Sequence, residues 1–222
     1  MRKTKKLILA STLCIFSFLA TNGFTKQVVE IVHIARFSMM DLDGWKSKSF
    51  EGETQYTISN DEKKYYLKAE SMQSASALYK KIKVNIHETP YLNWSWRIDQ
   101  ALPKLNEKEK FGDDYAARIY VVFKTGFTPL STKALNYIWS SNNDGSSYWP
   151  NAYTEKAIMI PIRTNQDKTH DWKHEKVNIE VDLMKHFTTV PKYIDGVAIM
   201  TDSDNSKGNA SASYGDIYFS RN

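Results

Sequence analysis

Apolar and polar residues alternate along much of this chain. The clearest case is the segment 92–98, LNWSWRI, in which every second residue is apolar. Strict alternation is typical of a β-strand with one face in the core and the opposite face exposed. We therefore expect Trp94 and Trp96 to lie next to each other in the core, on one face of a central strand. Arg97 belongs to the opposite face of that strand.

The same two-residue period predicts strands at many other places. They are the segments 54–59, 65–69, 75–84, 117–123, 136–140, 158–162, 177–181, 196–201 and 214–220. Pro161 puts one of these strands near a sheet edge or a bulge, because proline cannot donate a ladder hydrogen bond. Turn-forming sequences such as SNDEK, NNDGSS and SDNSKGN separate the strands.

Helical patterns are scarce. Residues 182–187 are compatible with one or two helical turns capped by Asp182, and residues 104–110 form a charged loop or a short helix. Many strands, frequent turns and few helices predict an all-β fold, namely an antiparallel β-sandwich. No linker interrupts residues 24–222, so we expect them to form a single domain.

The first residues have the pattern of a secretory signal peptide. Four basic residues precede residue 7, residues 7–20 carry no charge, and the small residues Thr21 and Gly23 fit a cleavage site after Gly23. The apolar run is shorter than the roughly 20 residues of a membrane-spanning helix. We expect residues 1–23 to be removed, leaving a periplasmic or secreted protein without a membrane span. An uncleaved N-terminal anchor is the alternative.

Removal of this leader changes the charge balance. The whole chain has 30 basic and 25 acidic residues, and without the leader 26 basic residues face 25 acidic ones. A nearly neutral protein gives no support to nucleic-acid binding, which requires a net basic surface. The sole cysteine, Cys14, lies in the leader. The remaining chain therefore has no internal disulfide and no thiol nucleophile.

Several phrases of the sequence occur together in a recognisable order. They are YLNWSWRID, GDDYAARIYVVF, LNYIWSS, VNIEVDLMKHF and GVAIMTDSDNS, followed by ASYGDIYF. In order and spacing they resemble a bacterial family of exported proteins without assigned function, the domain of unknown function 3047. The resemblance covers nearly the whole chain after the leader. It implies an envelope protein with a jelly-roll β-sandwich of the carbohydrate-binding-module or galactose-binding type, and it supplies no catalytic residues.

An oxygen-rich stretch lies near the end of the chain. Asp202, Asp204 and Asn205 follow an apolar run, and Ca²⁺ takes about six to eight oxygen ligands of this kind. These three residues are the candidate metal ligands, with calcium as the candidate ion. The EF-hand pattern is absent, because Lys207 stands where glycine is required and Ser213 where a bidentate glutamate is required. The alternative is a hydrated turn in which the side chains bond the backbone.

Two carboxylates open a strand that contains an arginine. Asp113 and Asp114 shortly precede Arg118, whose strand is otherwise apolar. An isolated charge is costly to bury, so Arg118 requires carboxylate oxygens within hydrogen-bond reach. Asp202 leaves another core strand at its rim. We therefore expect the turn 202–209 to lie beside Asp113, Asp114 and Arg118.

These charges have two interpretations. Arg97 and Arg118 can pair with the aspartates and tie strands together, which is the usual arrangement for buried charges. Alternatively, Arg97, Arg118, Asp113 and Asp114 line a concave sheet face and hydrogen-bond an uncharged ligand. Arginine and aspartate together can bracket the vicinal hydroxyls of a sugar.

Aromatic residues form the third candidate group. Tyr137, Trp139 and Trp149 lie in or near the segment SSNNDGSSYWPNAY. Flat rings beside amides and hydroxyls suit a sugar, whose C–H face packs on the ring while its hydroxyls form hydrogen bonds. The alternative is that Tyr137 and Trp139 pack in the core and Trp149 anchors a loop.

No established catalytic motif occurs in the sequence. There is no GxSxG elbow, P-loop, GxGxxG or HExxH, and no carboxylate pair is singled out as that of a glycosidase. The sequence therefore assigns no catalytic residues. We expect an exported β-sandwich that binds a glycan or another polyhydroxylated envelope component without changing it. The alternatives are a carbohydrate-active hydrolase or lyase, and a structural module that binds calcium for stability only.

Overall fold

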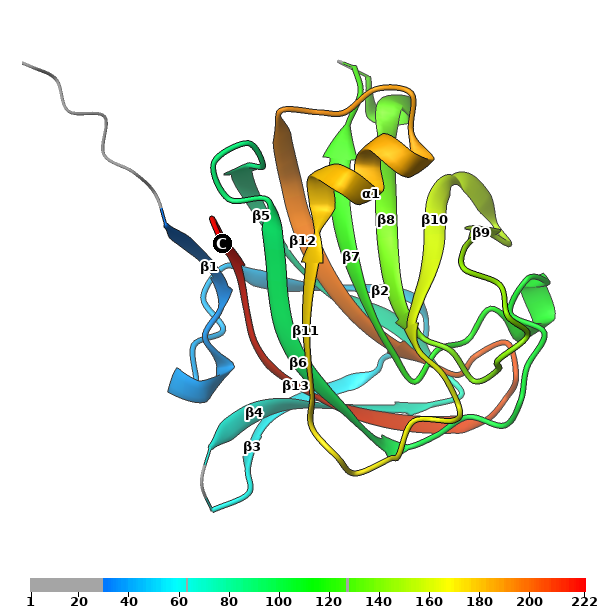
Figure 1. Ribbon diagram of the computed structural model, residues 1–222. Helices are drawn as coiled ribbons and strands as arrows, with labels where there is room; N and C mark the ends of the chain where they lie inside the picture. Colours follow the sequence, from blue (N-terminus) through cyan, green and yellow to red (C-terminus); the bar gives the residue numbers. More distant parts are fainter. Residues whose placement is uncertain (1–29, 63, 127) are drawn as a thin grey trace, which may run out of the picture.

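The computed structural model describes residues 30–222 apart from residues 63 and 127. The predicted signal peptide at residues 1–23 lies outside the described residues. Within the described part, two β-sheets form a sandwich (Figure 1), as the alternating pattern predicted. No helix in this part is both long enough and apolar enough to span a membrane.

The first sheet contains six of the described strands. Its order is β11–β6–β13–β4–β3, with β1 paired to β13. The bounds are β1 (Ile31–Ala35), β3 (Gln55–Asn60), β4 (Tyr65–Met72), β6 (Tyr91–Gln100), β11 (Lys173–Asn178) and β13 (Asn209–Ser220). All of its pairs are antiparallel.

The second sheet contains seven of the described strands in the order β2–β5–β12–β7–β8–β10–β9. The bounds are β2 (Trp45–Glu51), β5 (Ala75–Asn85), β7 (Ala117–Lys124), β8 (Thr132–Trp139), β9 (Trp149–Asn151), β10 (Thr154–Arg163) and β12 (Tyr193–Asp202). One pair departs from the antiparallel prediction, since β8 and β10 run parallel. The long connection between them carries the chain back to the starting end of β8 before β10 begins.

Aromatic side chains from both sheets fill the middle of the core. Trp94 and Trp96 on β6 are buried, as predicted, and meet edge to face with centroids 5.3 Å apart. They pack against Tyr137 and Trp139 of β8, at centroid distances of 5.5 and 5.8 Å. The predicted bulge is also present, because the pairing of β10 with β8 shifts register after Pro161.

The helix α1 (Ile179–His186) lies across one end of the sandwich (Figure 1). The sequence pattern predicted a strand through residues 177–181 and a helix capped by Asp182, and this boundary was wrong. The strand ends at Asn178, whose side chain accepts a hydrogen bond from the Val181 amide at 3.2 Å and caps the helix. Ile179 and Leu183, one helical turn apart, are both buried in the core.

The other described helices are single 3-10 turns, η1 (Phe37–Met39), η2 (Lys110–Gly112) and η3 (Pro129–Ser131). The charged segment 104–110 is thus mostly loop and ends in η2. The strands β1, β2 and β9 were not predicted, because their sequences carry no clear apolar alternation. Of these, β2 contributes to the candidate site.

Candidate functional site

A cavity of about 510 Å³ opens on the outer face of the seven-stranded sheet. Side chains alternate across β7 and β12, so Ile119 and Ile199 point into the core. Arg118, Tyr120 and Met200 point the other way and line the cavity.

Arg118 is buried although it carries a charge. Its Nη2 forms an ion pair with Asp202 Oδ2, and its Nη1 lies 4.0 Å from Asp113 Oδ2. The rings of Tyr115 and Tyr120 lie 4.9 and 5.4 Å from the guanidinium carbon, which adds cation–π attraction. Burial opposes the charge, but Asp202, Tyr120 and Asp113 together hold the pKa of Arg118 above its ordinary value. The Nε–H group has no hydrogen-bond partner among the described residues.

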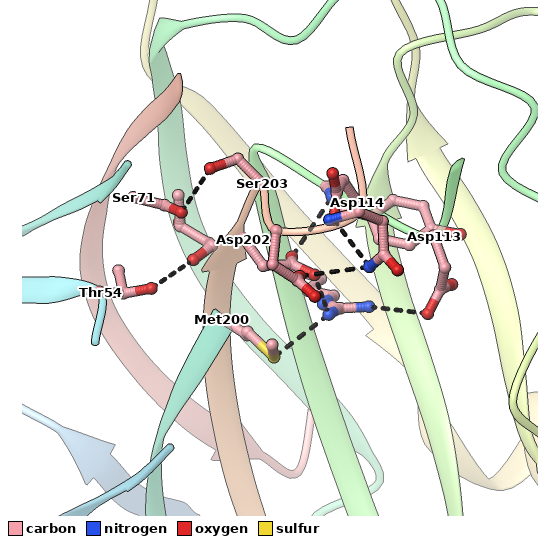
Figure 2. Close-up of polar contacts among 12 residues, drawn as sticks. Thr54, Ser71, Asp113, Asp114, Met200, Asp202 and Ser203 are labelled. Carbon is pink, nitrogen blue, oxygen red and sulfur yellow. Dashed lines mark hydrogen bonds and ion pairs between the residues drawn. The ribbon is translucent and has the colours of Figure 1, made fainter. Parts of the chain in front are cut away.

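The end of β12 is fixed to the opposite sheet next to this ion pair. Figure 2 shows Asp202 with Ser203 beside it, close to Ser71 of β4. The hydroxyls of Ser203 and Ser71 are 2.7 Å apart, and Thr54 Oγ1 donates to the carbonyl of Thr201 at 2.8 Å. These bonds hold the Asp202 carboxylate in place.

The turn after β12 is held by Asp114, which is fully buried. Asp114 Oδ1 accepts hydrogen bonds from the backbone and side-chain amides of Asn205, at 3.2 and 3.1 Å. Asp114 Oδ2 accepts one from the Ser206 amide at 2.6 Å. The prediction that the 202–209 turn lies beside Asp113, Asp114 and Arg118 is confirmed.

Asp113 faces the cavity from the loop before β7. Both of its oxygens accept from Asn151 Nδ2, at 2.9 and 3.0 Å. Burial raises the pKa of Asp113, and the positive charge of Arg118 opposes this effect. Asn151 ends β9, so the β9–β10 hairpin forms one wall of the cavity. Tyr153 at the hairpin tip donates its hydroxyl to Asn205 Oδ1 at 2.6 Å, which connects this wall to the turn after β12.

The rim of the cavity is aromatic and open to solvent. Phe50 at the end of β2 is 59% exposed, and Tyr153 is 56% exposed. Both side chains line the cavity, together with the partly buried ring of Tyr120. The site thus combines buried polar groups at its floor with exposed rings at its rim.

A family described as "Protein of unknown function (DUF3047)" matches residues 43–218. The chain belongs to the DUF3047 family. A search of curated proteins found no match to the sequence.

Solved structures show what the fold of this DUF3047 protein is similar to. The family 30 carbohydrate-binding module of the cellulosomal cellulase Cel9D-Cel44B of Clostridium thermocellum superimposes with a TM-score of 0.51 at 14% identity, covering 86% of this chain and 98% of that one. The family 11 carbohydrate-binding module of Lic26A-Cel5E from the same organism gives a TM-score of 0.48 at 9% identity, covering 87% and 95% of the two chains. At such low identity, the first of these similarities establishes the fold alone.

Arg97 does not belong to the site of the DUF3047 protein. It lies on the outer face of the six-stranded sheet, whereas Arg118 lies on the outer face of the other sheet, so the core separates them. Arg97 pairs with Asp99 at 2.6 Å and lies between the rings of Tyr66 and Trp172, at 5.2 and 5.0 Å. The predicted pairing of Arg97 with Asp113, Asp114 or Asp202 was therefore wrong, because Arg97 is neutralised by Asp99 of its own strand β6.

The three aromatic candidates also lie away from the cavity. Tyr137 and Trp139 face the core rather than solvent, and Tyr137 donates its hydroxyl to Asp182 at 2.7 Å. Trp149, at the start of β9, is buried in a cluster with Tyr115, Ile138 and Met159. None of these three rings is available to pack on a ligand, because each one is covered by neighbouring side chains.

Two of the three proposed calcium ligands, Asp202 and Asp204, lie together with Asp114, which was not proposed as a ligand, and both already accept hydrogen bonds. Carboxylate oxygens of Asp114, Asp202 and Asp204 lie within 4.8 Å of one another. However, Asp202 faces the Arg118 guanidinium, and Asn205 Oδ1 accepts the Tyr153 hydroxyl. A fixed positive charge beside the ligands repels a cation. The group therefore does not fit a calcium site. Burial raises the pKa of Asp204, and the negative charge of Asp114 raises it further.

Two residues of the site, Phe50 and Asn151, have weak or absent sequence signals. Phe50 lies on β2 and shares a strand face with Lys46 and Lys48, so this face shows no apolar pattern in the sequence. Asn151 has no signal at all. Tyr120 was detectable, because the two-residue period places it on the same strand face as Arg118.

A buried glutamate supports the loops behind the site and leads to a pH prediction. Glu107 accepts hydrogen bonds from Ser140 Oγ at 2.7 Å and from the amide and hydroxyl of Ser141 at 2.5 and 2.8 Å. Burial raises the pKa of Glu107 from 4.5 to about 7, more than these bonds lower it. The folded protein therefore retains this proton between about pH 4.5 and 7, whereas the unfolded chain releases it.

Stability relative to a Glu107→Gln variant is accordingly expected to be greatest at low pH. It should fall by roughly 1–3 kcal/mol as the pH rises from 4.5 through 7. Urea titrations of both proteins across this range measure the effect. Glu109→Gln, an exposed change on the same loop, is the control. The prediction would be contradicted if the free energy of unfolding of the wild type, relative to that of Glu107→Gln, stayed constant or increased as the pH rises.

Proposed function

We propose that the cavity on the seven-stranded sheet binds a glycan, or another polyhydroxylated ligand, without changing it. One observation carries this proposal. The buried Arg118 and Asp113 side chains and the partly buried Asn151 meet the exposed rings of Phe50 and Tyr153 in one cavity of about 510 Å³. A sugar requires this combination, because its hydroxyls take directional hydrogen bonds while its C–H face packs on an aromatic ring.

The polar groups at the cavity floor are fixed before any ligand arrives. Asp113 is held by Asn151, and Arg118 is held by Asp202 and two tyrosine rings. The Nε–H of Arg118 is buried and has no hydrogen-bond partner, within the part of the chain that the structure describes. A ligand therefore meets donors and acceptors that have already lost their conformational freedom, which lowers the entropic cost of binding.

The rings at the rim are positioned by neighbouring lysines. Lys48 Nζ lies 4.8 Å from the centroid of Phe50, and Lys110 Nζ lies 5.3 Å from that of Tyr153. These contacts restrain the two exposed rings. The fold similarity to a carbohydrate-binding module of Clostridium thermocellum supports the proposal as a precedent for the architecture. The leader predicted in residues 1–23 would place this function in the periplasm or outside the cell.

A carbohydrate-active enzyme is the second candidate, and the raised pKa of Asp113 favours it. A general acid requires a carboxyl group that holds its proton. Against this role, both oxygens of Asp113 accept hydrogen bonds from an amide, an arrangement that suits the ionised form. Release of new reducing ends from a bound glycan would identify an enzyme instead of a binding module.

The test is a glycan-array screen of the purified protein with and without EDTA, followed by calorimetric titration of any glycan retained. Binding should resist EDTA, because the acidic group does not fit a calcium site. Phe50→Ala and Tyr153→Ala should each weaken binding roughly tenfold, since each removes one aromatic packing surface. Tyr153→Phe should retain most of the affinity because it retains the ring.

The matched control is Tyr148→Ala. Tyr148 is also exposed, but it packs against His186 outside the cavity. This variant should bind like the wild type. Retention of no glycan, or equal binding by the wild type and a Phe50→Ala/Tyr153→Ala double variant, would contradict the proposed function.

A further inference from the structure

A second cavity lies on the same outer sheet face and is basic. It has a volume of about 550 Å³, and it is lined by β5, β7 and β12. Lys81 and Lys83 of β5 and Lys124 of β7 line it and are exposed. The acidic residue in its lining is Asp195, which accepts the backbone amide of Lys124 at 3.0 Å.

The two cavities lie next to each other along β12, and the surface that they form together is called the β12 groove. The first cavity includes Tyr120 and the second includes Tyr79. Both tyrosines pair in register with Ala198 of β12, one from each side. Two residues earlier on β12, Lys81 of β5 and Val122 of β7 pair with Gly196 in the same way. Small residues on β12 thus form a floor between larger side chains on β5 and β7.

The lysines of the basic cavity have no ionic partners in the described part of the chain. Among the described residues, no ion pair within 4.0 Å involves the Nζ atoms of Lys81, Lys83 or Lys124. The β2 strand adds Lys46 and Lys48 to the same face, since they pair with Tyr79 and Ala77. These ammonium groups are concentrated on one face of a chain whose charges nearly balance after the leader.

We propose that this groove binds an anionic polysaccharide, whose acidic groups contact Lys81, Lys83 and Lys124 while a neighbouring sugar occupies the first cavity. The inference rests on the proposed glycan-binding function and specifies its ligand class. Charge complementarity identifies the acidic groups. Arg118 and Lys124 are six residues apart on β7, or about 20 Å at strand spacing, so a ligand that contacts both is a chain rather than one sugar.

The concave shape favours a polysaccharide over a flat anionic surface. The lysines lie on either side of β12, so a membrane surface cannot contact them all and also fill the groove between them. Tyr79 and Tyr120 lie between the basic and polar ends and offer rings to the sugars in the middle of the groove.

The experiment compares matched charged and neutral polysaccharides. The purified protein is titrated with polygalacturonate and its methyl ester, and with carboxymethylcellulose and hydroxyethylcellulose, at low and high ionic strength. The charged member of a pair should bind roughly tenfold more tightly at low salt, and the preference should shrink at high salt. A Lys81→Gln/Lys83→Gln/Lys124→Gln variant should lose the preference while retaining its affinity for the neutral member.

The control variant replaces three exposed lysines outside the seven-stranded sheet, Lys64, Lys168 and Lys176, and should keep the preference. Equal binding of charged and neutral members by the wild type would overturn the inference and leave the proposed function standing. Binding of neither member would overturn both. Retention of phosphatidylglycerol vesicles or DNA through the same lysines, without polysaccharide binding, would also overturn the inference. The Phe50→Ala variant separates the contribution of the first cavity from that of the basic cavity. It should weaken the binding of the charged and the neutral polysaccharide of a pair equally.

Discussion

Replacing Asp202 with alanine is expected to lower the free energy of unfolding by about 3–5 kcal/mol, because it leaves a buried charge without its partner. Arg118 is 3% exposed and Asp202 is 1% exposed. After the substitution, the nearest remaining carboxylate in the described structure is that of Asp113, 4.0 Å from Nη1. This distance is too long for a strong hydrogen bond. Urea titration of both proteins measures the loss.

A double-mutant cycle of Asp202→Asn with Arg118→Gln separates the ion pair from other effects. The loss in the double variant should be smaller than the sum of the two single losses by at least about 1 kcal/mol, since removal of both partners leaves no isolated charge. The more exposed pair Arg36–Asp41 is the control and should couple by less than about 1 kcal/mol. Additive losses at Asp202 and Arg118 would mean that the two groups do not meet.

The Trp96→Ala substitution is expected to destabilise the protein by about 3–5 kcal/mol, the range for large aromatic truncations in a core. Trp96 is fully buried and packs on Trp94 and Trp139. Its Nε1 also donates to Glu175 at 3.0 Å. The substitution therefore opens a cavity in the core. It also removes one hydrogen bond from the Glu175 carboxylate, which forms an ion pair with Arg163 at 2.8 Å.

Denaturant titration of Trp96→Ala, Trp96→Phe and Phe111→Ala checks this expectation. Trp96→Phe keeps an aromatic ring in the core and should cost less than Trp96→Ala. Phe111 is 67% exposed, so its removal should change stability by less than about 1 kcal/mol. A similarly small loss for Trp96→Ala would place Trp96 outside the energetic core.

The location of the ion pair followed from the sequence, because an arginine in an apolar strand requires carboxylates. Asp113, Asp114 and Asp202 were the candidates, and the structure brings Asp202 and Asp113 to Arg118, with Asp114 next to Asp202. The division of roles among them did not follow. Asp202 neutralises the guanidinium, Asp114 holds the turn after β12, and Asp113 faces the cavity. These roles depend on distances of a few ångströms between separate loops.

For the aromatic candidates, the sequence did not decide whether the rings lie in the core or in the site. Tyr137 and Trp139 alternate in a strand, and the alternation alone does not say which face of that strand is buried when the second sheet is unknown. The packing of Trp94 and Trp96 against them decides that they are core residues. The exposed rings of the site come from Phe50 and Tyr153 instead, one of them on a strand without apolar alternation.

The sequence by itself determined the class of the fold, most of its strands and the need for carboxylates around Arg118. These properties depend on neighbours along the chain and on the cost of burying an unpaired charge. Only the tertiary structure decided that Arg97 and Arg118 lie on opposite outer faces, that β8 and β10 run parallel, and that a polar cavity lies beside a lysine-lined cavity along β12. Such features depend on the order of strands in the two sheets, and pairing between distant segments fixes that order.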